Sequence, residues 1–419
     1  MRVWLAVFAL FVAAHCRKVF IGDQVFRINA ESEEQIQLLK RLEEDYVSKL
    51  DFWTHPVSTD LPVDIHVPYT SLGTVKTFLQ QNKIPFHVMI NDLQDLLNEE
   101  QKDLVKNALN QRSAKNINFA AYHTLETIYK WIDSLVADHP NLVSKLNIGN
   151  SYENRPMYVL KFSTGGSKRP AIWVDAGIHS REWVSVASAV WMANKMATDF
   201  GDDPSITSLL SQMDVYLLIV TNPDGYVYTH TNDRMWRKTR SINPGSICRG
   251  VDPNRNWDAG FGGPGASNNP CSDSYHGSSA HSEIEVKNIV DLVNSHGNFK
   301  AFISIHAYSQ LLMYPYGYSC TAVSHQAELD LVGRKAVKAL SSLYGTSYKV
   351  GSICKIIYQA SGGSIDWTYN TGIKYSFAFE LRDTGRYGFL LPANQIIPTA
   401  SETWLALKYI MEYVRDHPY

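Results

Sequence analysis

The 419-residue chain predicts an α/β fold, with a mixed central sheet flanked by helices and a small α+β module in front of it. From residue 113 onward, short apolar segments alternate with longer amphipathic ones, which is typical of strands buried between helices. Residues 17–112 differ, because they carry more acidic than basic side chains and no cysteine. Hydrophobic residues make up 45% of the chain and charged residues 19%, which excludes long disorder, a coiled coil and collagen.

The first sixteen residues predict a cleaved signal peptide. An apolar run from Val3 to Ala14 follows Arg2, and it is too short to cross a bilayer as a helix. Small side chains at Ala14 and Cys16 suit the positions before a cleavage site. The alternative is a buried N-terminal strand. We expect residues 1–16 to be removed and the protein to be secreted, extracellular and soluble, since no other segment approaches the ~18 apolar residues of a spanning helix.

Residues 17–112 predict a small α+β sandwich of antiparallel type, followed by a connecting helix. The expected elements, in order, are a strand at 18–29, a helix at 33–49, a strand at 63–67, a helix at 70–82, a strand at 85–91 and a long polar helix at 92–111. The helix ends in a polar joint that contains Arg112 and Lys115. A trypsin-like protease could cut such an exposed basic joint, with an ordinary linker as the alternative.

Residues 113–419 predict one large domain in which strands and helices alternate. Strands are expected at 157–161, 171–176, 215–220, 301–305 and 375–381, and helices at 125–139, 184–199, 282–295, 328–344 and 395–417. Ligands in such folds bind at the carboxyl ends of the strands. The glycine-rich loops lack a phosphate-binding pattern, and a net charge of −2 offers no basic excess for nucleic acid or an anionic membrane.

Four cysteines remain once Cys16 is removed, and an even number in an oxidising compartment predicts two disulfides. Three connectivities are open. The pairs Cys248–Cys271 and Cys320–Cys354 are favoured because they close the two shortest loops. No Cys-x-x-Cys pair is present, so a metal site built from these cysteines is not expected.

Three side chains at strand ends suggest a zinc site. His179 and Glu182 follow the apolar strand at 171–176, and Gly177 permits a sharp turn that aims both side chains at one point. His306 ends the strand at 301–305 and would converge on them. Taken singly, each fits a surface or core position as well. Together, two imidazoles and one carboxylate leave a fourth coordination position for water, as in catalytic zinc sites.

A general base and a cationic anchor complete the expected site. Glu380 is the lone carboxylate of the apolar strand at 375–381, and its burial is costly unless it has a task or a partner. A salt bridge to Arg382 or a lysine is the alternative. Arg237 and Arg255 are candidates for holding an anionic substrate group, because guanidinium binds carboxylate in a bidentate manner.

Taken together, these motifs resemble the pancreatic zinc metallocarboxypeptidases, in particular those of the A type. The resemblance covers the signal peptide (1–16), an activation pro-segment (17–112) and the zinc carboxypeptidase domain (113–419). The matching segments are His179-Ser-Arg-Glu182, Asp252-Pro-Asn-Arg-Asn-Trp257, Ile305-His306, Tyr358-Gln-Ala-Ser-Gly-Gly-Ser-Ile-Asp-Trp367 and Phe379-Glu-Leu-Arg-Asp383.

The resemblance implies roles for individual residues. One Zn²⁺ per chain would bind His179, Glu182 and His306. Glu380 would be the general base, and then the general acid, that activates the water at zinc, and Arg237 would stabilise the oxyanion. The substrate's terminal carboxylate would be held by Asn254, Arg255 and Tyr358. Its upstream part would be guided by Arg181, Tyr308 and Phe389. The orientation of His179 would be set by Asp252.

The same resemblance implies an uncharged pocket for the substrate's terminal side chain. Ile365 stands where relatives that cut after Lys or Arg carry an acid, so aromatic and large aliphatic side chains are expected. Ala378 enlarges the pocket, which with Met313 and the Cys320/Cys354 pair resembles the tryptophan-preferring A2-type branch. The implied lining is Ser304, Met313, Gly317, Ile353, Ala360, Gly363, Ile365 and Ala378.

The expected partners are peptide C-termini as substrate, a trypsin-like protease that cuts after Arg112, and the pro-segment as an intramolecular inhibitor. Neither nucleic acid nor a membrane is expected as a partner, and a monomer is expected. Two other functions are alternatives: a non-catalytic carboxypeptidase-like binding module, and a different metallohydrolase such as an aminopeptidase or amidohydrolase. Asn254, Arg255 and Tyr358 favour recognition of a carboxylate over an amine.

Overall fold

The computed structural model describes residues 17–47, 49–111 and 117–419. Two sheets organise these residues. The first is four-stranded and antiparallel, in the order β2-β3-β1-β4, and two helices cover it. Its elements are β1 (Gln24–Ile28), α1 (Glu33–Asp45), β2 (Asp51–Phe52), β3 (Val63–Val67), α2 (Leu72–Gln81) and β4 (Phe86–Ile90).

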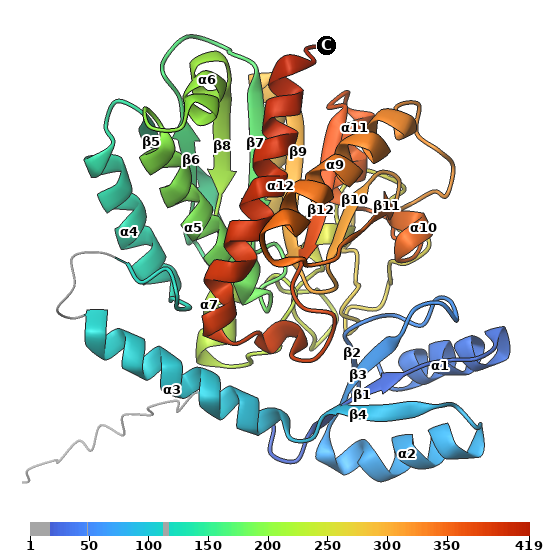
Figure 1. The fold of residues 1–419 in the computed structure, drawn as a ribbon. Helices are drawn as coiled ribbons and strands as arrows, with labels where there is room; N and C mark the ends of the chain where they lie inside the picture. Colours follow the sequence, from blue (N-terminus) through green and yellow to red (C-terminus); the bar gives the residue numbers. More distant parts are fainter. Residues whose placement is uncertain (1–16, 48, 112–116) are drawn as a thin grey trace, which may run out of the picture.

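A long helix, α3 (Leu93–Gln111), leads from this module to the rest of the chain. In Figure 1 the module, in blue, and α3, in cyan, lie along one end of the larger domain. That end is where the functional residues described below gather. The module therefore covers the larger domain at its site rather than at a distant surface.

The second sheet has eight strands in the order β11-β10-β12-β9-β7-β8-β6-β5. The four central strands, β12, β9, β7 and β8, are parallel, and antiparallel pairings on either side make the sheet mixed. The strands are β5 (Val143–Asn150), β6 (Pro156–Phe162), β7 (Ala171–Ala176), β8 (Asp214–Leu218), β9 (Phe299–Ala307), β10 (Leu311–Tyr314), β11 (Lys349–Ser352) and β12 (Tyr375–Leu381).

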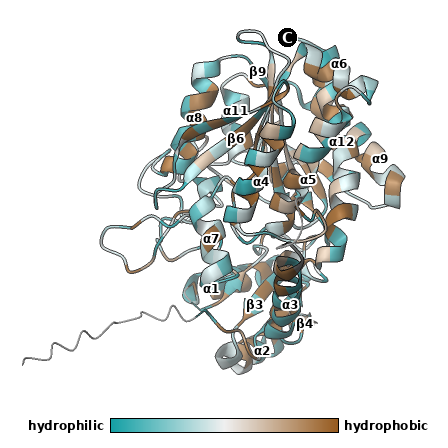
Figure 2. Ribbon diagram, turned by 90° about the vertical axis from the view of Figure 1, so that its left-hand side faces the viewer, coloured by the Kyte–Doolittle hydropathy of each residue, from teal (hydrophilic) through white to brown (hydrophobic). Residues whose placement is uncertain are grey.

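Helices pack on both faces of this sheet (Figure 1). They are α4 (Leu125–Asp138), α5 (Trp183–Asp199), α6 (Pro204–Gln212), α7 (Pro223–Thr231), α8 (Ile284–His296), α9 (Gln326–Tyr344), α10 (Ile353–Ile356), α11 (Ser364–Asn370) and α12 (Ile396–Asp416). Helix α5 is buried along most of its length, and Figure 2 shows hydrophobic residues along much of it.

Side chains alternate between the two faces of the central strands and fill two separate cores. Ile303 and Phe377 point into the core shared with α5 and α12, whereas Phe302 and Ala378 point into the core shared with α8 and α11. The second face also carries His306, which lies four residues after Phe302. The site therefore lies where this face reaches the carboxyl ends of the parallel strands.

The predicted fold class is confirmed, including the antiparallel sheet of the first module and the mixed sheet of the second. The strands at 63–67, 171–176 and 375–381 have the predicted bounds. Other ends differ: the first strand covers Gln24–Ile28 only, and the helix predicted at 33–49 ends at Asp45. The short strands β2, β10 and β11, the longer strand β5, and helices α6, α7, α10 and α11 were not predicted.

Two predictions fall outside the described residues, namely the signal peptide at 1–16 and the cleavage joint at Arg112 and Lys115. Among the residues that the structure describes, no helix is both long and apolar enough to cross a membrane.

Candidate active site

A tight turn after β7 positions the first two candidate metal ligands. Gly177 adopts a φ of +65°, and a Cβ there would lie 2.7 Å from Val186 Cγ2, so the turn needs glycine. The chain then passes His179 and reaches Glu182, which precedes the first residue of α5. Both side chains are buried.

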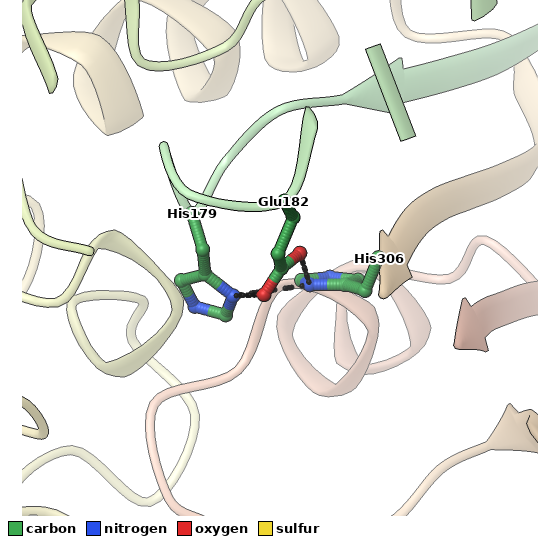
Figure 3. A group of neighbouring side chains, drawn as sticks. All are labelled: His179, Glu182 and His306. Atoms are coloured by element: carbon green, nitrogen blue, oxygen red, sulfur yellow. Dashed lines mark hydrogen bonds and ion pairs between the residues drawn. The ribbon is translucent and has the colours of Figure 1, made fainter. Parts of the chain in front are cut away.

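The third candidate ligand comes from the neighbouring strand. His306 lies near the end of β9, which pairs in parallel with β7 on one side and β12 on the other. Its ring approaches the other two side chains: His306 Nδ1 lies 3.2 Å from His179 Nδ1 and 3.4 Å from Glu182 Oε2 (Figure 3). The opposite oxygen, Glu182 Oε1, lies 2.7 Å from His179 Nδ1.

These three side chains fit a zinc ion. One donor atom from each lies within 4.8 Å of the others, and all three residues are buried. Two imidazole nitrogens and one carboxylate are the donor set of catalytic zinc sites that keep a position open. Among the described residues, no other group of at least three His, Cys, Asp or Glu side chains converges in this way.

The outer nitrogen of each histidine has a partner that orients the ring. His179 Nε2 lies 3.1 Å from Asp252 Oδ1, as expected. His306 Nε2 lies 3.0 Å from the Ser304 hydroxyl, which donates to Asp175 Oδ1 at 2.6 Å. Burial raises the pKa of Asp175. Such outer contacts set ring orientation and basicity in metal sites, so Asp175 is a supporting residue that sequence reasoning missed.

Asp252 connects His179 to two other predicted site residues, Arg237 and Asn254. Its Oδ2 accepts from Arg237 Nε and Nη2 at 3.1 and 2.9 Å, and its Oδ1 accepts from Asn254 N at 2.9 Å. Burial opposes ionisation, but the charges of Arg237 and His179 hold the pKa of Asp252 well below its usual value. Arg237 is thereby held with Nη1 3.9 Å from Glu182 Oε1, beside the candidate zinc ligands.

Glu380 lies opposite this cluster, where β12 pairs with β9 in register with His306. The salt bridge considered from the sequence does not form, because Arg382 donates from Nε to Glu402 Oε1 at 2.7 Å. No ion pair to Glu380 occurs within the described ranges. Burial, reinforced by the charge of Glu182, raises the pKa of Glu380 to about 8. A carboxylate with a raised pKa in a cleft is suited to accept and return a proton.

The predicted carboxylate-binding residues also meet here. Arg255 Nη2 donates to the Tyr358 hydroxyl at 2.9 Å, while Arg255 Nε and Nη1 are held by the carbonyls of Gly265 and Asn254. The Asn254 side-chain oxygen accepts from Ser364 N at 2.9 Å. One guanidinium nitrogen therefore points at a tyrosine hydroxyl at the rim of the cavity.

A cavity of about 520 Å³ joins these residues to an apolar pocket. It is lined by six of the eight predicted pocket residues and by the predicted aromatic residues Tyr308, Tyr358 and Phe389. Ser304 and Gly317 do not line it: the Ser304 hydroxyl faces His306 and Asp175, and the Gly317 N–H faces Asp366. The six that line it are Met313, Ile353, Ala360, Gly363, Ile365 and Ala378.

The four-stranded module contributes side chains to the same cleft. Asp51 accepts from Arg181 Nη1 with both oxygens at 2.9 Å, and Trp53 packs edge-on against Phe389 with ring centroids 5.0 Å apart. Asp64 accepts from the Tyr308 hydroxyl at 2.7 Å. The sequence predicted Arg181, Tyr308 and Phe389 in the substrate groove. It did not identify the module residues that contact these three side chains, which are Asp51, Asp64 and Trp53.

The cysteines are joined as Cys248–Cys271 and Cys320–Cys354, which are the two favoured pairs. The second bridge links the loop after β10 to α10, and Ile353 of α10 lines the cavity. The second bridge therefore ties the loop after β10 to a helix that lines the cavity.

Fold and site together define a zinc carboxypeptidase with an activation peptide. Residues 128–406 match the family model described as zinc carboxypeptidase, and residues 26–100 match the model described as carboxypeptidase activation peptide. The chain belongs to the zinc carboxypeptidase family and is a metallocarboxypeptidase, which confirms the resemblance seen in the motifs. Membership in this family implies Zn²⁺ as the metal.

Individual relatives match over the full chain. Carboxypeptidase A2 of Mus musculus is 61% identical over 419 residues, and carboxypeptidase A1 of Homo sapiens is 59% identical over 419 residues, with 100% of both chains covered in each case. Among solved structures, thrombin activatable fibrinolysis inhibitor (TAFI) is 38% identical with a TM-score of 0.87, covering 95% of this chain and 100% of that one.

Proposed function

We propose that this chain is a secreted zymogen whose enzyme domain, beginning at Ser113, releases aromatic and bulky aliphatic residues from peptide C-termini. The observation that carries this specificity is the apolar lining of the cavity beside Arg255. Ile365, Ile353 and Met313 offer no charge to a substrate side chain. A desolvated lysine or arginine would be costly there, whereas a large apolar side chain gains by burial.

The terminal carboxylate of the substrate would bind Asn254 and Arg255. Arg255 Nη2 already donates to an oxygen atom, that of Tyr358, so a carboxylate oxygen would replace this hydroxyl at a prepared donor. The substrate's last side chain would then enter the apolar pocket. This arrangement selects the last residue of a chain, because an internal residue has no free carboxylate.

His179, Glu182 and His306 would hold one Zn²⁺ per chain. When bound, zinc supplies Lewis acidity, which polarises the scissile carbonyl and makes water a stronger nucleophile at neutral pH. Glu380 would take a proton from the attacking water and pass it to the leaving amine. Arg237, which Asp252 holds in place, would donate to the developing oxyanion.

The pro-segment would inhibit by occupying the upstream part of the cleft. Asp51 binds the Arg181 guanidinium, and Trp53 packs against Phe389. A peptide therefore cannot contact Arg181 or Phe389 while the module is in place. Cleavage after Arg112 by a trypsin-like protease would separate the module from the enzyme domain. The same scheme includes signal removal after residue 16 and a monomeric product.

Peptides ending in Trp, Phe, Leu and Lys, assayed before and after trypsin treatment, test these points. We expect little activity before trypsin, and release of Trp, Phe and Leu but not Lys after it. Substantial release of Lys would refute the pocket assignment. Full activity of the untreated chain would refute inhibition by the pro-segment.

A further inference from the structure

Asp366 is a buried carboxylate directly behind the apolar pocket, and no step described so far uses it. It lies in the first turn of α11, one residue after the pocket residue Ile365, and it is 0% exposed. A buried carboxylate is unfavourable unless hydrogen bonds or charges compensate it. Within the described part of the chain, Asp366 makes no ion pair with a lysine, arginine or histidine. Its compensation must therefore come from elsewhere.

That compensation comes from the backbone of the loop after β10. Gly317 N donates to Asp366 Oδ1 at 3.0 Å and Oδ2 at 2.8 Å, and Tyr318 N donates to Oδ2 at 2.9 Å. Two consecutive peptide N–H groups thus converge on one carboxylate, an arrangement that binds anions well. Because these bonds reach another loop and not the first turn of α11 itself, stabilisation of that helix does not explain the position of Asp366.

The loop held by Asp366 supports the pocket wall. Gly317 O accepts from Ala360 N at 2.9 Å, and a Cβ on Gly317 would lie 2.8 Å from Ala360 O and 3.1 Å from Ile353 Cγ2. Gly317 is therefore packed against two residues that line the cavity. A shift of the Gly317–Tyr318 backbone would be passed directly to Ile353 and Ala360.

A second contact from α11 reaches the same loop. The Tyr316 hydroxyl donates to Asn370 Oδ1 at 2.9 Å, one helical turn beyond Asp366. Helix α11 therefore presents Ile365 to the pocket and, at two points, anchors the loop that packs against Ile353 and Ala360. The buried anchor is Asp366, and the exposed one is Asn370.

We propose that Asp366 is a positioning residue of the specificity pocket: by holding the Gly317–Tyr318 backbone, it sets the depth available to the substrate's terminal side chain. The inference rests on the proposed function, because that function places the side chain in this pocket. Binding of a large terminal side chain such as tryptophan requires the full depth of the pocket, whereas binding of a leucine side chain does not. Loss of the anchor should therefore weaken binding of tryptophan more than binding of leucine.

The test compares Asp366→Asn with the wild type after trypsin treatment, on matched peptides ending in Trp and in Leu. An amide keeps one acceptor oxygen but turns an NH₂ group toward backbone donors, which leaves one buried N–H unpaired. We expect KM for the Trp peptide to rise about tenfold, because the unpaired N–H would displace the Gly317–Tyr318 backbone and with it the pocket wall formed by Ile353 and Ala360. We expect kcat for both peptides, and KM for Leu, to change less than about twofold.

Glu285→Gln is the matched control, because Glu285 is also a buried acid that accepts a backbone N–H but does not line the cavity. It should leave the Trp-to-Leu ratio of KM unchanged. Equal changes in KM for both peptides, or a fall in kcat alone, would overturn the role of Asp366. Failure of the wild type to release Trp would instead refute the proposed function.

If Asp366→Asn does not fold, Asn370→Ala replaces it, since this change removes only the exposed anchor. The expected result is a smaller rise, about twofold to threefold, in KM for the Trp peptide alone, because exposed hydrogen bonds contribute less. An unchanged Trp-to-Leu ratio in a folded Asn370→Ala enzyme would overturn the proposal.

Discussion

Replacement of Glu285 by glutamine should stabilise the protein in a pH-dependent manner. Glu285 lies in the first turn of α8 and is fully buried; its Oε1 accepts from Tyr152 N at 3.0 Å, and its Oε2 has no hydrogen-bond partner in the described structure. Burial raises the pKa of Glu285 to about 7. The folded protein therefore keeps a neutral acid at pH values where the unfolded chain is ionised.

The sign and size follow from proton linkage. Between the ordinary pKa of 4.5 and about 7, the folded state binds the proton more tightly, so the free energy of unfolding falls as pH rises. Each pKa unit corresponds to about 1.4 kcal/mol, so the full loss is about 3 kcal/mol. Glutamine resembles the protonated acid in shape and cannot ionise. Glu285→Gln should therefore be more stable than wild type by about 1 kcal/mol at pH 5 and about 3 kcal/mol at pH 8.

Urea unfolding of the untreated chain at pH 5, 6, 7 and 8 measures this difference. The control is Glu126→Gln, because Glu126 also lies in the first turn of a helix, α4, but its side chain is 78% exposed. That control should show no stabilisation that grows with pH. A Glu285→Gln gain that is the same at all four pH values, or absent at pH 8, would refute the linkage argument.

Four further results are expected. Glu380→Gln should lower kcat by at least about 100-fold with little change in KM, and undiminished turnover would refute its assignment as base. Treatment with a chelator should abolish peptide hydrolysis and added Zn²⁺ should restore it; activity that survives metal removal would contradict the metal assignment. Ile365→Asp should lower release of C-terminal Phe by about 100-fold and introduce release of Lys, and an unaltered preference would exclude this residue from the pocket. Asp51→Asn should raise the activity of the untreated zymogen about tenfold by weakening the contact with Arg181, whereas the exposed control Asp60→Asn should not.

Local chemistry made much of the candidate site predictable. His179 and Glu182 sit three residues apart beyond a strand, and His306 ends another strand, so the carboxyl edge of a parallel sheet was a sound place to expect all three. Strands flanked by turn residues and rich in β-branched side chains were recognised because their period is visible in the sequence. The short strands β10 and β11, at one side of the sheet, were missed because four residues carry too little pattern.

Supporting contacts were not predictable, because they join residues far apart in the chain. Asp175 lies in an apolar strand, and nothing in its neighbourhood reveals the Ser304 hydroxyl that bridges it to His306. Likewise, Ser304 and Gly317 share a face or loop with pocket residues, yet each turns its polar group away from the cavity. Only packing determines which of several neighbouring side chains reaches the open space.

The sequence by itself determined the strand and helix pattern, the donor types of the metal site and the lone acid of β12, because these depend on residue type and short-range period. The tertiary structure alone decided that Arg382 pairs with Glu402, which leaves Glu380 without an ion-pair partner among the described residues, and that Asp51 of the first module binds Arg181. Both outcomes depend on which charges meet after the chain has folded. Local sequence patterns cannot predict such pairings, because the paired residues lie far apart in the chain.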